Sequence, residues 1–570
     1  PVLGYSDTTT ETGTAYEYSV TRSAQDIVEV GFFTVGREIP AIDRRGKVLL
    51  LVDETLVAPL QHRLSRFARD LTGDGWNVIF HRGPRDDGRD IRKTLERADG
   101  IRTWIKAQYQ DDPFDSYAII LVGALPYVMA GQVGPDGHGG RPHPTDLFYA
   151  DVDGQWALAR DEEGEIFVAN PQLPSDRIEM QIGRIDFSDH RKDDQSAELQ
   201  KLSAYFDKNH HWRNGLHEDL RNGYWDRKHL QVERDGLLNI VGAQGLSKGG
   251  HHDIGEEKPW LFGADFGSYK AADYRDFRNK AVFAINFGSH KQRIEQPNNA
   301  LRATLAQPWY TAAAGWGARP AWRLHHMALG GTIGEAHMRT VNNGEAASPY
   351  RESMEYFPTG LYLWRNPIWV NLLGDPTLRA FMFAPPRAAE LVRQGNTADL
   401  SWAASPDTSV RGYEVYRASS DAAFESIASL DANILTYTDE NAPPDARYMI
   451  RAKGLKEVPA GSFFTLSQGV FAIADATVVT APDIELEGTG GSGIPLPLVQ
   501  TDADTTLMQA PISVGAHGLV TFEDGRWVYT PNEGFTGKDV IRYTSSDHFT
   551  TAEGKITLRI TPPSQQETSQ

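Results

Sequence analysis

The sequence predicts a multidomain protein in which an α/β domain, a mostly parallel sheet covered by helices, is followed by two all-β sandwich domains. A chain of 570 residues exceeds one hydrophobic core, because domains typically hold about 100 to 200 residues. Residues 41–383 alternate short apolar runs with amphipathic stretches, which is the pattern of a helix-covered parallel sheet. After residue 384 the sequence becomes rich in Thr, Asp, Pro and Gly with alternating apolar residues, as in β-domains.

The elements of the α/β region follow from the spacing of its apolar residues. Short buried runs predict strands at 47–53, 76–80, 116–123, 178–185, 260–264 and 281–287, with a last element near 368–381. Helical spacing of Leu, Ile and Phe predicts helices at 60–71, 91–105 and 199–206. Open α/β sheets bind ligands beyond the carboxyl ends of their strands. We therefore expect a site in the loops after residues 264 and 287.

Two sandwiches are expected over residues 384–476 and 477–562, and residues 563–570 form a polar tail of linker type. The segment that contains Asp7 and Tyr16 aligns without gaps onto the one that contains Asp439 and Tyr448. Residues 1–40 are therefore expected to be the last two strands and the linker of a sandwich whose front half is missing. The repeat suggests a chain cut or processed from a longer array.

The composition of the chain excludes several classes of function. The chain has 57 Lys and Arg against 76 Asp and Glu, a formal charge of −19, which disfavours nucleic acid as a partner. It has no cysteine, so disulfides and thiolate catalysis are excluded. No apolar run approaches the roughly 20 residues of a membrane-spanning helix. We expect a bacterial protein that is extracellular or on the cell surface.

Two motifs and the element order of residues 45–382 carry a resemblance to a known family. They are Ile-Gly-Arg-Ile at 182–185 and Gly-Asp-Pro-Thr-Leu at 374–378, just before a β-sandwich. The α/β region resembles the gingipain-type cysteine peptidases, which implies a caspase-like fold. Residues 384–475 similarly resemble a fibronectin type III domain, and residues 478–562 resemble the Ig-like or cadherin-like repeats of bacterial surface proteins.

The resemblance implies a catalytic His in a Gly-His-Gly loop after one strand and a Cys after the next. Here the first loop reads Phe-Gly-Ala-Asp-Phe-Gly at 262–267, and the second contains Ser289 and His290. Asp265, Ser289 and His290 are the candidates for a replacement, since Ser, His and a carboxylate suffice for acyl transfer. His252 and Asp253 precede the strand at residue 260 and are further candidates. The alternative is that all of them are ordinary loop residues whose side chains form hydrogen bonds with backbone groups.

Other residues suggest ligands. Asp146, Asp151 and Asp153 supply hard oxygen atoms for calcium, or form a plain solvated loop. Adjacent histidines such as those at 325–326 are expected to splay apart, with one packed and one solvated, and no compact zinc motif occurs. The aromatic candidates for a sugar-binding platform, which could equally fill the core, are Trp260, Tyr269, Trp316 and Trp322.

The leading interpretation is a gingipain-like domain without its cysteine nucleophile that serves binding, adhesion or a structural role. Its partner is an extracellular polysaccharide or protein, and homo-assembly through the β-domains is also considered. The alternative is an extracellular hydrolase or lyase that acts on polysaccharide or protein through His and carboxylate groups in the strand-end cleft.

Overall fold

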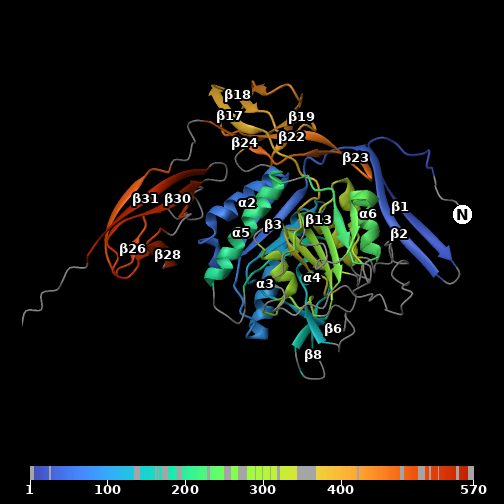
Figure 1. The fold of residues 1–570 in the computed structure, drawn as a ribbon, viewed down its shortest axis with the longest axis horizontal. Helices are drawn as coiled ribbons and strands as arrows, with labels where there is room; N and C mark the ends of the chain where they lie inside the picture. The colour runs from blue at the N-terminus through green and yellow to red at the C-terminus, as the bar shows by residue number, and fades with distance from the viewer. Residues whose placement is uncertain are drawn as a thin grey trace, which may run out of the picture.

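The computed structural model arranges the chain as an α/β body with an N-terminal hairpin, a small sheet and two β-sandwiches around it (Figure 1). The residues that it describes are 6–24, 27–113, 115–133, 141–160, 164, 166–169, 177–188, 195–217, 219–226, 231–249, 258–266, 279–288, 290–297, 299–307, 310–317, 321–342, 368–419, 423–474, 481–498, 508–511, 515–523, 526–546 and 551–562. In this part of the chain no helix is both long and apolar enough to cross a membrane.

The α/β body contains a ten-stranded sheet. In spatial order its strands are β12 (Leu246–Lys248), β11 (Gly223–Trp225), β13 (Trp260–Phe266), β14 (Ala281–Phe287), β15 (Ala313–Trp316), β16 (Leu372–Gly374), β10 (Gln181–Ile185), β5 (Tyr117–Val122), β3 (Gly46–Asp53) and β4 (Trp76–Gly83). Every pairing is parallel except that between β15 and β16. The sheet therefore consists of two parallel halves that run in opposite directions, a reversal that apolar runs alone do not reveal.

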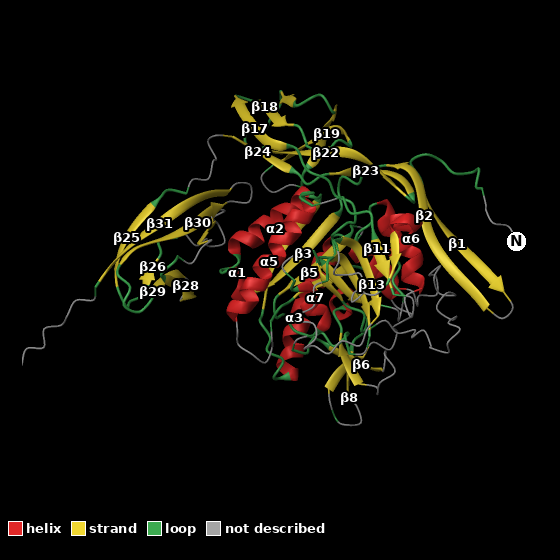
Figure 2. Cartoon of the chain, viewed as in Figure 1, coloured by secondary structure: helices red, strands yellow, loops and turns green. Residues whose placement is uncertain are grey.

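Helices cover this sheet (Figure 2). They are α1 (Glu54–Val57), α2 (Gln61–Gly73), α3 (Ile91–Asp111), α4 (Leu147–Ala150), α5 (Gln195–Arg213), α6 (Gln231–Gly245), α7 (Ala300–Leu305), the 3₁₀ helix η3 (Leu324–Leu329) and α8 (Ile333–Val341). Side-chain caps begin several of them: Asp90 accepts from two backbone amides of α3, and Thr332 accepts from one of α8. Strands β3 and β5 are buried along their lengths, as continuous apolar runs require.

The Gly-Asp-Pro-Thr-Leu segment has a structural role. Asp375 is fully buried and accepts hydrogen bonds from Arg213 at 2.5 Å and Asn209 at 2.9 Å, both on α5. A Cβ on Gly183 would lie 2.4 Å from the carbonyl oxygen of Gly374, so a larger residue would separate β10 from β16. The Gly-Asp-Pro-Thr-Leu segment therefore connects the sheet to α5, and Gly183 of the Ile-Gly-Arg-Ile segment allows β10 to lie close to β16.

A small mixed sheet, with antiparallel and parallel pairings, projects from the α/β body. Its strands, in the order β7 (Arg141–Pro144), β6 (Met129–Val133), β9 (Ile166–Ala169) and β8 (Ala157–Arg160), were not expected from the sequence. They are short, and strand prediction needs longer alternation.

Strands β17 to β24 form the first β-sandwich. One sheet contains β17 (Arg387–Gln394), β18 (Thr397–Ala403) and β21 (Thr436–Asp439). The other contains β20 (Glu425–Asp431), β19 (Val410–Ala418), β22 (Arg447–Val458) and β24 (Val470–Ala474). Trp402, Tyr413 and Tyr448 pack between them, as their spacing predicts. Strand β17 also pairs in parallel with β24, so the two sheets are joined along one edge. Three strands on one face and four on the other is the arrangement of a fibronectin type III-like sandwich.

The second sandwich consists of two smaller sheets. Their strands are β25 (Ile484–Thr489), β31 (Thr551–Thr561), β30 (Gly537–Ser546) and β27 (Met508–Pro511) in one, and β26 (Ile494–Pro495), β29 (Arg526–Pro531) and β28 (Gly518–Glu523) in the other. Tyr529 and Tyr543 are completely buried in its core. The OH of Tyr529 donates to Asp539 at 2.6 Å, which satisfies the polar end of a buried ring.

The N-terminal residues form an antiparallel hairpin of β1 (Ala15–Ala24) and β2 (Ile27–Ile39). Strand β2 pairs in parallel with β23 (Gly461–Leu466). Strand β23 follows β22 of the first sandwich and pairs with it in antiparallel orientation. The repeat is not reproduced contact for contact. Tyr448 donates to Asp439, whereas Asp7 accepts from Tyr18 at 2.8 Å and not from Tyr16. The shift is two residues, which keeps the ring on the same face of the strand.

Candidate functional site

Three parallel strands, β13, β14 and β15, end side by side at one edge of the sheet. Asp265 pairs in register with Asn286, and Asn286 pairs with Trp316. We call this row of three residues, together with Lys291 after β14, the strand-end cluster. All four are at most 1% exposed. The cluster therefore lies where a site is expected in an α/β fold, but beneath the surface.

Lys291 is the residue of this cluster that the sequence interpretation missed. Its ammonium donates to the carbonyl oxygen of Phe287 at 3.0 Å. Burial lowers the pKa of Lys291 to about 7, while the charge of the Asp265 carboxylate opposes the shift. The sequence offered one signal for Lys291, which is its position four residues after the end of a buried strand. A buried carboxylate at the end of the neighbouring strand needs a nearby cation, and a lysine in the following loop can provide it.

Asn286 brings a second unexpected feature. Among the described residues its Nδ2 has no hydrogen-bond partner, although the side chain is 1% exposed. Unsatisfied buried amides are uncommon in proteins. The nearby Trp316 indole donates to the carbonyl oxygen of Gly288 at 3.0 Å, so it closes the end of β14.

The predicted catalytic residues are only partly brought together. Asp265 is in the strand-end cluster, whereas His290 is exposed and has a φ of 66°, a left-handed conformation that fixes a turn. Ser289, His252 and Asp253 lie outside the described residues. The described residues thus provide a buried acid and an exposed imidazole.

The aromatic platform is corrected by burial. Trp260, Trp316 and Trp322 are 2%, 0% and 1% exposed, so their faces pack in the core and offer no surface to a sugar ring. The Trp322 indole donates to the carbonyl oxygen of Trp316 at 2.7 Å. Tyr269 lies outside the described residues.

The predicted calcium ligands separate into two groups. Asp146 is paired with Arg184 at 2.6 Å, with both side chains buried, so it is not available to the loop that follows. This corrects its assignment as a calcium ligand. Asp151 and Asp153 instead meet Glu179, with one carboxylate oxygen from each residue within 4.8 Å of the others.

Glu179 is the unexpected member of this carboxylate group. Burial raises the pKa of Glu179 to about 7, and the negative charges of Asp153 and Asp151 raise it further. The hydrogen bond from the Val152 amide acts in the opposite direction. Its side chain is 7% exposed, and its Oε1 has no hydrogen-bond partner among the described residues. Arg102 donates to the backbone carbonyls of Asp151 and Gly154 and so orders the loop from its other side.

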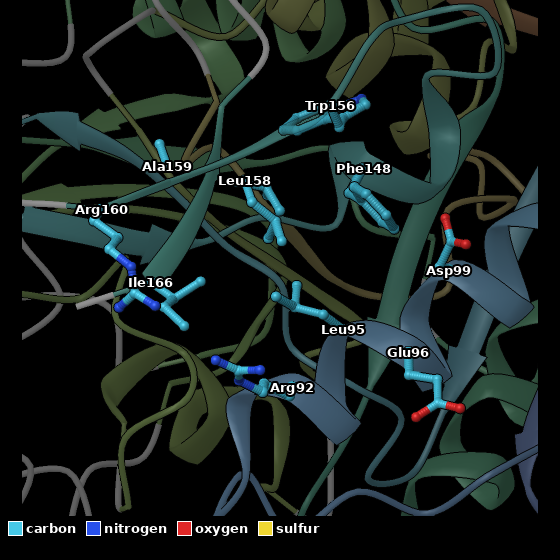
Figure 3. A pocket seen from close by; sticks show the side chains of 11 residues that line it. Arg92, Leu95, Glu96, Asp99, Phe148, Trp156, Leu158, Ala159, Arg160 and Ile166 are labelled. Carbon is cyan, nitrogen blue, oxygen red and sulfur yellow. The ribbon is translucent and has the colours of Figure 1, made fainter. Parts of the chain in front are cut away.

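A cavity of about 690 Å³ lies between α3 and the small sheet (Figure 3). Its lining combines an apolar floor with charged side chains at the rim, namely Leu95, Phe148, Trp156, Leu158, Ala159, Ile166 and Val168 with Arg92, Glu96, Asp99 and Arg160. The volume is within the range of ligand pockets. The indole of Trp156 donates to Asp151 at 3.0 Å, which links the cavity to the carboxylate group.

Comparisons with known proteins identify only the β part. The sequence profile of the bacterial Ig domain family matches residues 473–559. No curated protein matches the chain. A fibronectin type III-like protein from Clostridium thermocellum is 23% identical with a TM-score of 0.13, and the match covers 16% of this chain and 95% of that one. The chain therefore contains a bacterial Ig-like domain beside the fibronectin type III-like sandwich described above.

Two further solved structures are similar over equally small parts. Pectate lyase PelI from Erwinia chrysanthemi, in complex with tetragalacturonic acid, is 22% identical with a TM-score of 0.13, over 20% of this chain and 38% of that one. A fibronectin type III domain of human collagen XX is 15% identical with a TM-score of 0.12, over 15% and 95%. Shares of this size are too small to span the α/β body.

Proposed function

We propose that this chain is a secreted or cell-surface bacterial protein that binds extracellular polysaccharide or protein and has no peptidase activity. In this proposal the α/β body is a gingipain-like scaffold without the cysteine nucleophile. The supporting observation is the interaction of Asp265 with Lys291 at the strand ends. The peptidases that the sequence resembles use a histidine and a cysteine after two neighbouring strands.

The chemistry of this pair favours a structural role. A nucleophile or general base has to reach the substrate within hydrogen-bonding distance. Asp265 and Lys291 are each 1% exposed, and the Lys291 ammonium donates to a backbone carbonyl. Two buried opposite charges that interact in this way stabilise this end of the sheet only while both are present.

The cavity between α3 and the small sheet is the binding surface in this proposal. The half-buried Trp156 ring offers a flat apolar face. The arginines at the rim can bond hydroxyl or carboxylate groups, and the carboxylates there can accept from hydroxyl groups. Leu158, which is 69% exposed, adds apolar surface beside them. This combination suits a glycan chain with acidic sugars.

Calcium is the ion that we propose for Asp151, Asp153 and Glu179. Three carboxylate oxygens within 4.8 Å of one another repel unless a cation or protons neutralise them. Oε1 of Glu179 accepts no hydrogen bond from the described residues and has only the Arg177 guanidinium 3.9 Å away, so it can supply a buried ligand atom. The ion would order the loop from which Trp156 enters the cavity.

Two assays test the proposed function. The purified chain is incubated with casein and peptide libraries, and no cleavage is expected. Cleavage that disappears in Asp265→Ala or His290→Ala overturns the binding-only reading. A glycan screen with product analysis forms the second assay, in which binding without new reducing ends or unsaturated products is expected.

Site variants locate the binding. Arg92→Ala and Leu158→Ala remove a charge and an exposed apolar group from the cavity lining, and each is expected to weaken glycan retention. Arg37→Ala and Leu519→Ala are matched controls, since both side chains are well exposed and belong to other domains. Equal retention by all four variants would place the binding surface elsewhere.

A further inference from the structure

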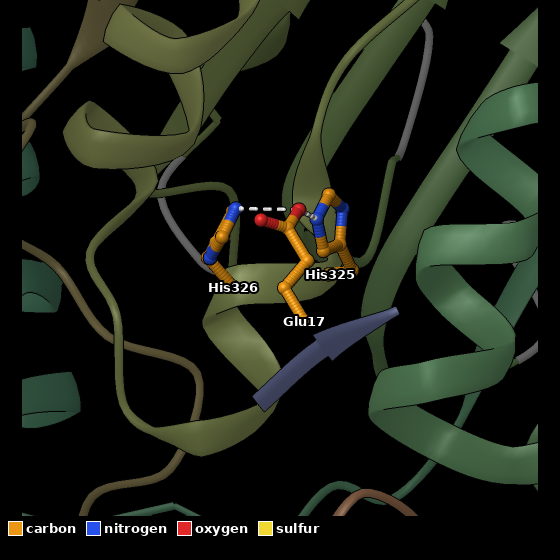
Figure 4. A group of neighbouring side chains, drawn as sticks. All are labelled: Glu17, His325 and His326. Carbon is orange, nitrogen blue, oxygen red and sulfur yellow. Dashed lines mark hydrogen bonds and ion pairs between the residues drawn. The ribbon is translucent and has the colours of Figure 1, made fainter. Parts of the chain in front are cut away.

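Three side chains of types that can bind a metal ion, far apart in the sequence, meet beside the α/β body (Figure 4). Glu17 comes from β1 of the N-terminal hairpin, and His325 and His326 come from η3. Nε2 of His325 lies 2.6 Å from Oε1 of Glu17, and Nε2 of His326 lies 3.4 Å from the same oxygen. The adjacent histidines do not splay apart as the sequence suggested, because the 3₁₀ turn directs both rings toward one carboxylate.

These distances can be compared with a zinc site. Zinc bonds of about 2.0–2.1 Å in a tetrahedral arrangement place neighbouring ligand atoms about 3.3 Å apart. The distance from His326 to Glu17 already has that length, and the distance from His325 requires an opening of under about 1 Å, within side-chain rotation. The ring centroids of the two histidines are 4.2 Å apart, close enough for two nitrogens to share one ion.

The surroundings hold this arrangement in place. The hydroxyl of Thr34 donates to the carbonyl oxygen of His325 at 2.9 Å, and the Thr34 amide donates to Asn239 on α6 at 2.8 Å. The ring of Phe32 stacks near His325 with centroids 6.2 Å apart. Strand β2 therefore ties η3 to the hairpin on one side while Glu17 of β1 approaches it on the other.

Imidazole binds metal ions in its neutral form, through a ring nitrogen that carries no proton. The Arg323 guanidinium, which lies over the Phe32 ring at 5.2 Å, is the charge that acts against a cation here.

We propose that Glu17, His325 and His326 bind one zinc-class divalent ion through two nitrogens and one oxygen. The side chains of Glu17 and His326 are 29% and 12% exposed, so the fourth position of the ion faces solvent and takes water. The ion joins the N-terminal hairpin to the α/β body. It is independent of the strand-end cluster and of the function proposed above.

The test uses the full chain without a histidine tag, stripped by a chelator and then titrated with Zn²⁺. One tight equivalent is expected by calorimetry and elemental analysis, and Co²⁺ should give the visible absorption of a tetrahedral site. Glu17→Gln and His326→Ala are expected to weaken binding by roughly 10-fold and 100-fold or more. His211→Ala is the control, because His211 is an exposed histidine of the pair His210–His211, whose centroids are 6.2 Å apart.

The result decides between a metal site and a hydrogen-bonded glutamate. If the stripped chain takes up no Zn²⁺, or if Glu17→Gln and His326→Ala bind it as tightly as the parent and His211→Ala, the proposal is wrong and the three side chains form an ordinary acid–imidazole contact. Circular dichroism of each variant before titration establishes that the variants compared are folded.

Discussion

Arg451 of the first sandwich lies with its guanidinium 3.6 Å from the carboxylate of Asp74 in the α/β body, and neither side chain is more than 1% exposed. Three other arginines approach the same carboxylate: Arg213 at 3.0 Å, Arg45 at 4.0 Å, and Arg379, which also donates to Thr465 of β23 at 2.7 Å. One buried carboxylate thus organises the boundary between the two domains.

Asp74→Asn is expected to destabilise the chain strongly. Burial alone raises the pKa of Asp74, but the four arginine charges outweigh it and lower this pKa to about 2. The variant leaves four buried cations without their common anion, so we expect a loss of about 3–5 kcal/mol in the free energy of unfolding. Urea titration followed by tryptophan fluorescence measures it. Asp219→Asn, which alters an exposed pair with Arg221, should change stability little.

Lys208→Met is expected to change how stability depends on pH. The buried Lys208 ammonium donates to the carbonyl oxygens of Leu305 and Gln307 at 2.6 and 2.7 Å, and burial lowers its pKa to about 7 from 10.5. The unfolded chain therefore binds more protons between pH 7 and 10.5, and this lysine makes stability rise with pH there, by at most about 1.4 kcal/mol per pH unit.

The variant should flatten the slope between pH 7 and 10.5, because the titrating group is gone. The loss of the donor to two carbonyls should lower stability most clearly at high pH, where the parent no longer carries a buried charge. Thermal unfolding at several pH values provides the measurement. Lys201→Met on the exposed part of the same helix is the control. An identical slope in the parent and in Lys208→Met would contradict the assignment.

Glu179→Gln is expected to stabilise the calcium-free chain at pH 8 and to have less effect at pH 5. The folded-state pKa of Glu179 is raised to about 7, so the folded chain holds a proton that the unfolded chain releases, and stability falls as pH rises from about 4.5 to 7. Removing the ionisable group removes that loss. Millimolar Ca²⁺ should raise the Tm of the parent and leave that of the variant nearly unchanged. The opposite pattern would exclude Glu179 as a ligand.

Gly461→Ala is expected to detach the N-terminal hairpin. Gly461 has a φ of 121°, and a Cβ there would lie 1.9 Å from the carbonyl oxygen of Gly36 on β2. Hydrogen exchange of the Gly36 amide, which donates to Ala460 at 3.0 Å, should become much faster. Gly395→Ala is the matched control, because Gly395 has a φ of 63° but a Cβ there meets no atom within 4 Å. Equal exchange of the Gly36 amide in both variants would mean that the close contact at Gly461 does not hold the hairpin in place.

The local pattern of the chain was sufficient for much of the α/β body. The strands at 46–53, 117–122 and 281–287 are buried on both faces, so they read as unbroken apolar runs. The short strands of the small sheet, such as Ala157–Arg160, carry exposed residues at most positions and gave no such signal. The antiparallel contact of β15 with β16 depends on the path of the whole chain, which no local window contains.

The candidate site was less predictable for a related reason. Asp265 was recognised because it lies at the end of a predicted strand. Lys291 was missed because the carboxylate with which it interacts lies on a different strand, β13. The assignment of Asp146 failed because Arg184, 38 residues further along, takes its carboxylate. Trp316 and Trp322 were open to two interpretations, and burial decided between them.

By itself, the sequence determined the absence of thiol chemistry, the acidic surface and the order of α/β and β regions, because these depend on composition and on contacts between near neighbours. The tertiary structure alone decided which charges are paired. Glu17 and His325 are separated by 308 residues, and Asp74 meets Arg451 across a domain boundary. Electrostatic partners act over a few ångströms, so only the folded path of the chain selects them.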